Sequence, residues 1–199
     1  MFLISMSISI SMIERVELME KYKIIFLNGV TSSGKTSIAK AIQEMSDTNF
    51  YHVSNDHFHS LLWDFLDKPA QDVWKENFIH SVHTAESIAL MYHSINFLSE
   101  STNIIVDGML FETEAFTSKY GKTNYDCMRE ILHGQNMLVV EVYCPLDECR
   151  RRNIARGNRG ENQSHEQDAI MNKAVRHDIK VDTSVFSAEK CARQILDVF

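Results

Sequence analysis

Residues 23–36 read KIIFLNGVTSSGKT, and this stretch decides the fold. The apolar run 24–27 leads into the pattern G-x-x-x-x-G-K-[ST], which begins at Gly29 and ends at Thr36. Gly29 and Gly34 permit backbone angles that a side chain would forbid, so successive N–H groups can point at phosphate oxygens. The stretch therefore predicts a strand, a phosphate-binding loop and a helix whose positive end faces the anion.

The loop is expected to bind the phosphates of a nucleotide, and its residues have separate roles. Lys35 would place a cation on the β- and γ-phosphates, and the Thr36 hydroxyl would bind Mg²⁺. A helical pattern follows over 38–45, as the motif requires. The alternative is a Gly/Ser-rich turn that binds no ligand. The predicted nucleotide-binding residues are Gly29, Val30, Thr31, Ser32, Ser33, Gly34, Lys35 and Thr36.

The composition is that of one compact α/β domain. The 199 residues are 44% apolar and 24% charged, with few Pro and Gly residues. The net charge of −7 argues against a nucleic-acid-binding protein, which usually has a basic face. The four cysteines show neither C-x-x-C pairing nor metal-ligand spacing. This pattern favours reduced thiols in a cytoplasmic protein.

The chain divides into an N-terminal extension, residues 1–22, and a single domain, residues 23–199. Residues 1–13 read MFLISMSISISMI, which lacks the basic region of a signal peptide and is too short to span a bilayer. The alternation of Ile and Met with Ser suits an edge strand and equally a frayed tail. We therefore expect no membrane partner.

Strand-like and helix-like segments alternate along the domain. The strands are expected at 24–27, 50–54, 103–107, 137–144 and 179–182, and the main helices at 71–99, 112–119, 124–133, 146–155, 164–176 and 188–199. The helix at 164–176 would begin with a capping box, SHEQ. Such alternation predicts a parallel sheet with right-handed crossovers. The fold class is therefore α/β, a three-layer P-loop NTPase or kinase fold with a mostly parallel five-stranded sheet.

Two carboxylates follow strands that should end at the same edge as the loop. Asp107 follows the apolar run 104–106, where a carboxylate could hold Mg²⁺ beside the Thr36 hydroxyl. Asp56 follows the strand 50–54, where it could act as the base that accepts a proton from an attacking hydroxyl. The alternatives are local: Asp107 could bond to the next turn, and Asp56 could cap a helix.

An arginine-rich stretch, ECRRRNIARGNRGEN, covers residues 148–162. Arg152 and Arg156 share a helical face, and Arg159 lies in the Gly-flanked segment that follows. Guanidinium groups on a closing lid could neutralise charge on a transferring phosphoryl group. The alternative is a solvated basic helix end, stabilised by the helix dipole.

These residues, in this order and spacing, resemble the chloramphenicol phosphotransferase family. The resemblance extends over about residues 23–199 and includes the L-N-G lead-in at 27–29, the R-G-x-R pattern at 156–159 and the V-D-T sequence at 181–183. The resemblance implies that Asp56 is the base, that Lys35 and Thr36 serve ATP and Mg²⁺, and that Arg156 and Arg159 close over the phosphates. Gly108 stands where the family has a second acid, and the segments 57–77 and 109–123 match it poorly.

The sequence thus predicts an ATP-dependent enzyme that phosphorylates a hydroxyl of a small molecule, with chloramphenicol as the expected acceptor and antibiotic inactivation as the result. One alternative is a P-loop kinase with another acceptor, such as a nucleotide sugar or metabolite. Another is a nucleotide-dependent switch or toxin-like protein that transfers no phosphoryl group. The expected catalytic residues are Asp56, Lys35, Arg156 and Arg159, and the expected metal ligands are Thr36 and Asp107.

Overall fold

A five-stranded parallel sheet forms the centre of the computed structural model, which describes residues 24–66, 82–157 and 159–199. The strand order is β2-β3-β1-β4-β5. The strands are β1 (Ile24–Asn28), β2 (Phe50–Ser54), β3 (Asn103–Gly108), β4 (Met137–Tyr143) and β5 (Ile179–Asp182). All four pairings are parallel, which confirms the predicted sheet. All strands therefore end at one edge.

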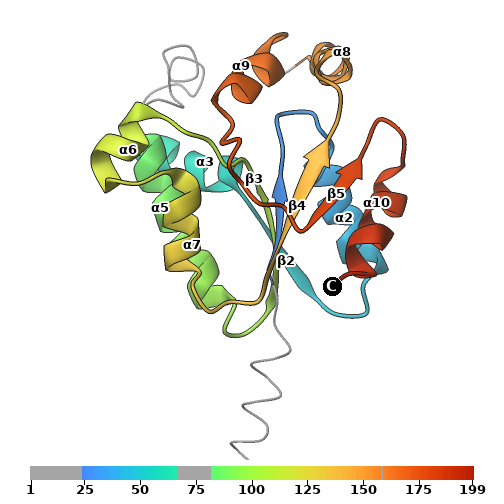
Figure 1. Cartoon of the computed structure of the whole chain (residues 1–199), viewed down its shortest axis with the longest axis horizontal. Helices are drawn as coiled ribbons and strands as arrows, with labels where there is room; N and C mark the ends of the chain where they lie inside the picture. The colour runs from blue at the N-terminus through green and yellow to red at the C-terminus, as the bar shows by residue number, and fades with distance from the viewer. Residues whose placement is uncertain (1–23, 67–81, 158) are drawn as a thin grey trace, which may run out of the picture.

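Helices cover both faces of the sheet, so the domain has three layers (Figure 1). Helices α5, α6 and α7 lie on one face, and α2 and α10 lie on the other. The helices are α2 (Lys35–Met45), α3 (Asn55–Leu66), α5 (Val82–Leu98), α6 (Glu114–Tyr120), α7 (Asn124–Ile131), α8 (Leu146–Arg156), α9 (Gln163–Ile170) and α10 (Ala188–Leu196). Helices α8 and α9 lie beyond the end of the strands.

The central strand β1 explains why its sequence is apolar without alternation. Its neighbours β3 and β4 pair with it on both sides, and every one of its residues is buried. Ile24 and Phe26 point into the core cluster under α5 and α7, whereas Ile25 and Leu27 point into the cluster under α2 and α10. A strand covered on both faces needs apolar residues at successive positions.

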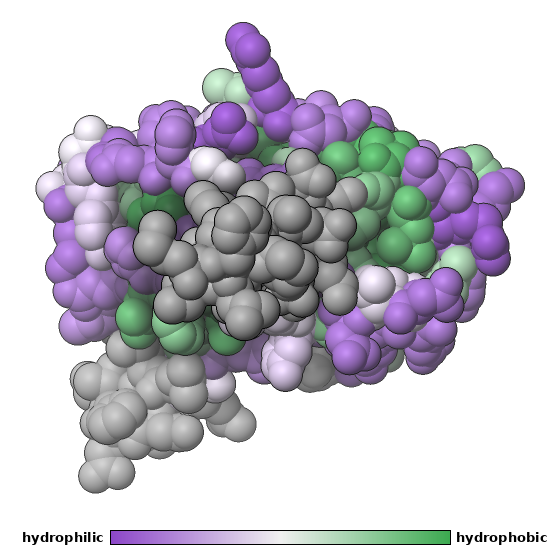
Figure 2. All heavy atoms as spheres, turned by 90° about the horizontal axis from the view of Figure 1, so that it is seen from below, coloured by the Kyte–Doolittle hydropathy of each residue, from purple (hydrophilic) through white to green (hydrophobic). Residues whose placement is uncertain are grey.

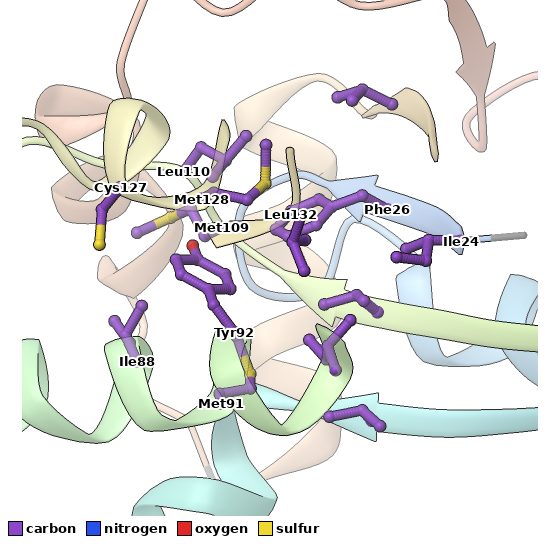
Figure 3. Packing of buried hydrophobic residues seen from close by; sticks show 14 of the residues in the cluster. Ile24, Phe26, Ile88, Met91, Tyr92, Met109, Leu110, Cys127, Met128 and Leu132 are labelled. Atoms are coloured by element: carbon purple, nitrogen blue, oxygen red, sulfur yellow. The ribbon is translucent and has the colours of Figure 1, made fainter. Parts of the chain in front are cut away.

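Tyr92 lies at the centre of the larger core cluster (Figure 3). Its ring is surrounded by apolar side chains from α5, α7 and the end of β3, among them Met109 and Met128. Its hydroxyl donates a hydrogen bond to Oδ1 of Asn124, which satisfies the polar end of a fully buried ring. Burial raises the pKa of Tyr92 well above its ordinary value.

Several helix ends differ from the sequence expectations. The helix predicted at 164–176 ends at Ile170, because Met171 is extended and pairs with Phe111. Asn162, and not Ser164, is the residue before the helix, so the predicted capping box is wrong. The region after β2 forms α3, which the sequence offered only as the alternative in which Asp56 caps a helix. Of the helix predicted at 71–99, residues 82–98 form α5.

The segment 71–81 lies outside the described residues, as do residues 1–22, the predicted extension. Viewed from the end where the strands begin, hydrophilic residues make up much of the visible rim, with apolar patches between them (Figure 2). Within 24–66, 82–157 and 159–199, no helix is long and apolar enough to cross a membrane.

Candidate active site

The phosphate loop lies between β1 and α2, and close packing explains its glycines. A Cβ on Gly29 would lie 2.6 Å from the carbonyl oxygen of Val142. Gly34 has a φ of +104°, in the left-handed region that other residues rarely adopt. A Cβ there would lie 3.0 Å from the side chain of Thr183. Close packing therefore requires glycine at 29, where φ is not positive, whereas Gly34 is favoured by its backbone angle and by the contact with Thr183.

Lys35 is held against its own loop. Its Nζ donates hydrogen bonds to the carbonyl oxygens of Gly29 (2.8 Å) and Val30 (2.9 Å), and lies 3.7 Å from Oδ1 of Asp107. Burial lowers the pKa of Lys35, while the negative charge of Asp107 opposes that shift. The ammonium group is thus fixed at the mouth of the loop.

Thr36 and Asp107 meet, as the sequence predicts for a metal site. The Thr36 hydroxyl donates a hydrogen bond of 2.6 Å to Oδ2 of Asp107, from which Nε2 of His52 lies 3.7 Å away. Burial alone would raise the pKa of Asp107, but the charge of Lys35 and the neighbouring His52 and Thr36 groups hold it at about 2. Asp107 is therefore a carboxylate at neutral pH.

One hydroxyl and one carboxylate suit Mg²⁺, which keeps several waters and takes further oxygens from substrate phosphates. The portions of the chain that are described contain no group of three or more His, Cys, Asp or Glu side chains that could hold a metal. The donor set of Thr36 and Asp107 therefore fits a Mg²⁺ ion shared with a nucleotide better than a metal held by protein ligands alone.

Asp56 lies in the first turn of α3, and Ser54 takes the capping role that the sequence left open for Asp56. The Ser54 hydroxyl accepts a hydrogen bond of 3.2 Å from the backbone N–H of His57. The carboxylate of Asp56 instead accepts a hydrogen bond of 2.7 Å from Nη2 of Arg159. Its side chain is 56% exposed and lines the cavity described below.

The two predicted lid arginines reach the same region from α8 and the segment after it. Arg159 binds Asp56, and Nη1 of Arg156 lies 3.5 Å from the hydroxyl oxygen of Ser32 in the phosphate loop. The arginines therefore connect the two halves of the site, the loop and the carboxylate after β2.

Three residues outside the predicted set, Arg152, Thr183 and Gln167, also contact the loop. Arg152 donates to the side-chain and carbonyl oxygens of Thr183 (3.0 and 2.8 Å), and the Thr183 hydroxyl donates to the carbonyl of Ser33 (2.6 Å). Oε1 of Gln167, in α9, accepts from the backbone N–H of Thr31 at 2.5 Å. In the sequence, the helical face that Arg152 shares with Arg156 points to Arg152 as a site residue, whereas no sequence pattern points to Gln167.

These groups surround a cavity of about 790 Å³ at the edge where the strands end. It is lined by the phosphate loop, the ends of β2 and β3, the first turn of α3, and parts of α8 and α9. Lys35, Thr36, Asp56 and Asp107 face it together with both lid arginines. Val30 and Ser33 are buried behind the loop and do not line it. The cavity thus combines a site for phosphates with a separate carboxylate.

The fold and this site define the class as a P-loop kinase-like phosphotransferase. Adenylyl-sulfate (APS) kinase CysC of Mycobacterium tuberculosis, solved with AMPPNP and APS, is similar with a TM-score of 0.59 and 17% identity, over 89% of this chain and 96% of that one. Shikimate kinase of Acinetobacter baumannii, solved with shikimate, has a TM-score of 0.59 and 16% identity, over 92% and 95%.

The chain belongs to the family of chloramphenicol phosphotransferase-like proteins, whose model matches residues 22–199. A Mycobacterium tuberculosis protein (strain H37Rv) named "Putative O-phosphotransferase" is 25% identical over 193 residues, which span 89% of this chain and 82% of that protein. The resemblance inferred from the sequence is confirmed by the family match.

Proposed function

We propose that this protein uses ATP and Mg²⁺ to phosphorylate a hydroxyl group of a small molecule, and that chloramphenicol is the acceptor. The observation that carries the proposal is the cavity itself. It is lined by the phosphate loop, by the Thr36–Asp107 pair and by the Asp56–Arg159 pair. Transfer between two bound substrates requires such an arrangement, because the reacting atoms must be held in line.

On the nucleotide side, both backbone and side-chain groups would bind the phosphates. The loop amides would bind phosphate oxygens, and Lys35 would turn from the carbonyls of Gly29 and Val30 to the β- and γ-phosphates. Thr36 and Asp107 would hold Mg²⁺, which neutralises charge on the phosphates when it is bound.

On the acceptor side, Asp56 would accept the proton of the attacking hydroxyl. The hydroxyl oxygen forms a bond to the γ-phosphorus while the bond from that phosphorus to the β–γ bridging oxygen breaks, and ADP leaves. Arg159 and Arg156 would stabilise the charge on the phosphoryl oxygens during transfer. Arg159 is paired with Asp56 and lines the same cavity as the phosphate loop.

The family match is the reason for proposing chloramphenicol as the acceptor. Phosphorylation of its hydroxyl would inactivate the antibiotic. The test is ATP consumption by the purified full chain, with Mg²⁺, in the presence and absence of the drug. Mass spectrometry would detect the drug with one added phosphoryl group. We expect drug-dependent ATP consumption and a phosphorylated product in this assay. In the cell, we expect the enzyme to act in the cytoplasm.

Absence of product at saturating drug would refute the antibiotic assignment. A panel of hydroxylated acceptors, including nucleotide sugars and small metabolites, would then test the wider kinase assignment. If no acceptor stimulated turnover while nucleotide still bound, the O-kinase proposal would fail and a nucleotide-dependent switch would replace it.

A further inference from the structure

Asn28 is the last residue of β1 and is fully buried directly before the phosphate loop. Both ends of its side-chain amide are bonded. Oδ1 accepts a hydrogen bond of 2.9 Å from the backbone N–H of Leu110, and Nδ2 lies 2.9 Å from Nε2 of His177. The three residues are far apart in the sequence, so only the fold brings them together.

The Leu110 bond joins the end of β1, directly before the phosphate loop, to the chain that follows the neighbouring strand β3. Leu110 follows Gly108, the last residue of β3, and Met109, and both of these residues line the cavity. Leu110 is itself bonded at its carbonyl, which accepts from the backbone N–H of Asn172 at 3.0 Å. Residue 172 lies in the connection from α9 to β5. One side chain therefore holds the loop, the wall and the chain that returns from α9.

A carboxamide suits this position because it donates and accepts at once. Since Nδ2 can only donate, Nε2 of His177 must present a lone pair, which requires a neutral imidazole. Burial lowers the pKa of His177, against the opposing charge of Glu141. The other charged groups that act on the imidazole are Lys180, which also lowers its pKa, and Asp178, which raises it.

We propose that Asn28 is a positioning residue for phosphoryl transfer, which holds the cavity wall at Met109, just after β3, in place beside the phosphate loop through its bonds to Leu110 and neutral His177. The inference rests on the proposed function, because the wall matters only if an acceptor binds there. Small displacements of reacting groups are costly: a shift of about 1 Å can lower a rate on the order of 100-fold.

The first test compares Asn28→Ala with Asn124→Ala. Asn124 is also fully buried and accepts from Tyr92, but it is the first residue of α7 and does not line the cavity. Both variants should be less stable to heat. We expect only Asn28→Ala to lower kcat of the folded protein, by roughly 10- to 100-fold, with the KM for ATP changed less than about threefold. Equal kcat values in the two variants would overturn the proposal.

The second test uses His177→Gln, whose introduced amide can accept from Asn28 at every pH. The ratio of the wild-type rate to the His177→Gln rate should fall as the pH is lowered through the pKa of His177, below its ordinary value of about 6.5. Taking the ratio removes the titration of groups that both proteins share. A ratio that stays constant between pH 7 and the lowest pH at which both remain folded would contradict the role of His177.

A third measurement needs no acceptor and separates this inference from the proposed function. Amide hydrogen exchange at Leu110 should be at least roughly tenfold faster in Asn28→Ala than in the wild type, because a buried hydrogen bond is lost. NMR titration should show a higher pKa for His177 in Asn28→Asp, since a carboxylate favours the protonated ring. Unchanged Leu110 exchange would overturn the inference even if transfer occurs. If the wild type transfers phosphate to no acceptor, the proposed function fails, and with it the positioning role.

Discussion

Replacement of Asp56 by asparagine tests the central claim of the proposed chemistry. The substitution keeps the size and position of the side chain but removes its capacity to take up a proton. A general base contributes roughly 10²- to 10⁴-fold to a rate. We therefore expect kcat of Asp56→Asn to fall by that factor, which corresponds to about 2.7–5.4 kcal/mol of transition-state stabilisation.

The structure predicts a small effect of the same substitution on folding. The Asp56 side chain is 56% exposed, so its ion pair with Arg159 should contribute about 0–1 kcal/mol. Its position in the first turn of α3 adds about 0.3–1 kcal/mol through the helix dipole. Nucleotide affinity should change little, because the Asp56 side chain is bonded to Arg159 and not to the phosphate loop.

Asp126 provides a matched control. It also lies in the first turn of a helix, α7, is hydrogen-bonded there by Thr123, and does not line the cavity. Asp126→Asn should lose a similar amount of stability in urea denaturation while keeping the wild-type kcat. The assay is the transfer rate with an acceptor that stimulates the wild type, combined with calorimetric titration of ADP. An Asp56→Asn rate within threefold of the wild-type rate would refute the assignment of Asp56 as the base.

Three further substitutions test the nucleotide side. Lys35→Ala should weaken ATP binding in calorimetric titration and also lower kcat in rate assays. An effect on only one of these two quantities would contradict the role of Lys35 as a phosphate-binding cation. The pKa of Asp107 is about 2 in the folded protein, against an ordinary 3.8. This difference corresponds to about 2 kcal/mol of stability, which is fully present at pH values well above 3.8 and is lost as the pH falls towards 2. Urea denaturation at pH 6 and pH 3 should show about half of this contribution lost at pH 3, so that the wild type loses about 1 kcal/mol more stability between the two pH values than Asp107→Asn. Gly34→Ala should destabilise the fold by about 1 kcal/mol or more and reduce ADP affinity, because of the positive φ and the contact with Thr183. Gly160→Ala, at a site with room for a Cβ, should do neither.

The sequence by itself determined the parts of this protein that depend on local chemistry. The spacing from Gly29 to Thr36 specifies a strand, a loop and a helix, because glycine conformations and backbone N–H groups act over only a few residues. The unbroken apolar run of β1 predicts a strand covered on both faces. The position of Asp107 after an apolar strand predicts a carboxylate beside Thr36, because parallel strands end at one edge.

Tertiary structure decided the outcome at positions where local sequence preferences were balanced. Ser54 and Asp56 are both favoured at helix caps, and only the path of α3 gives the cap to Ser54 and leaves Asp56 for Arg159. Helix α9 ends at Ile170, six residues earlier than expected, because Met171 pairs with the distant Phe111. Pairing across the fold here outweighs helical periodicity, a competition that the local sequence does not show.

The contacts of Asn28 likewise depend on the tertiary structure and not on the local sequence. The sequence identifies Asn28 only as a polar residue between a strand and a phosphate loop. Its partners are 82 residues away at Leu110 and 149 residues away at His177. A hydrogen bond depends on distance and direction in space, and no periodic pattern records which distant groups will meet. The sequence predicted a phosphate-binding loop, and the fold decided which residues surround that loop.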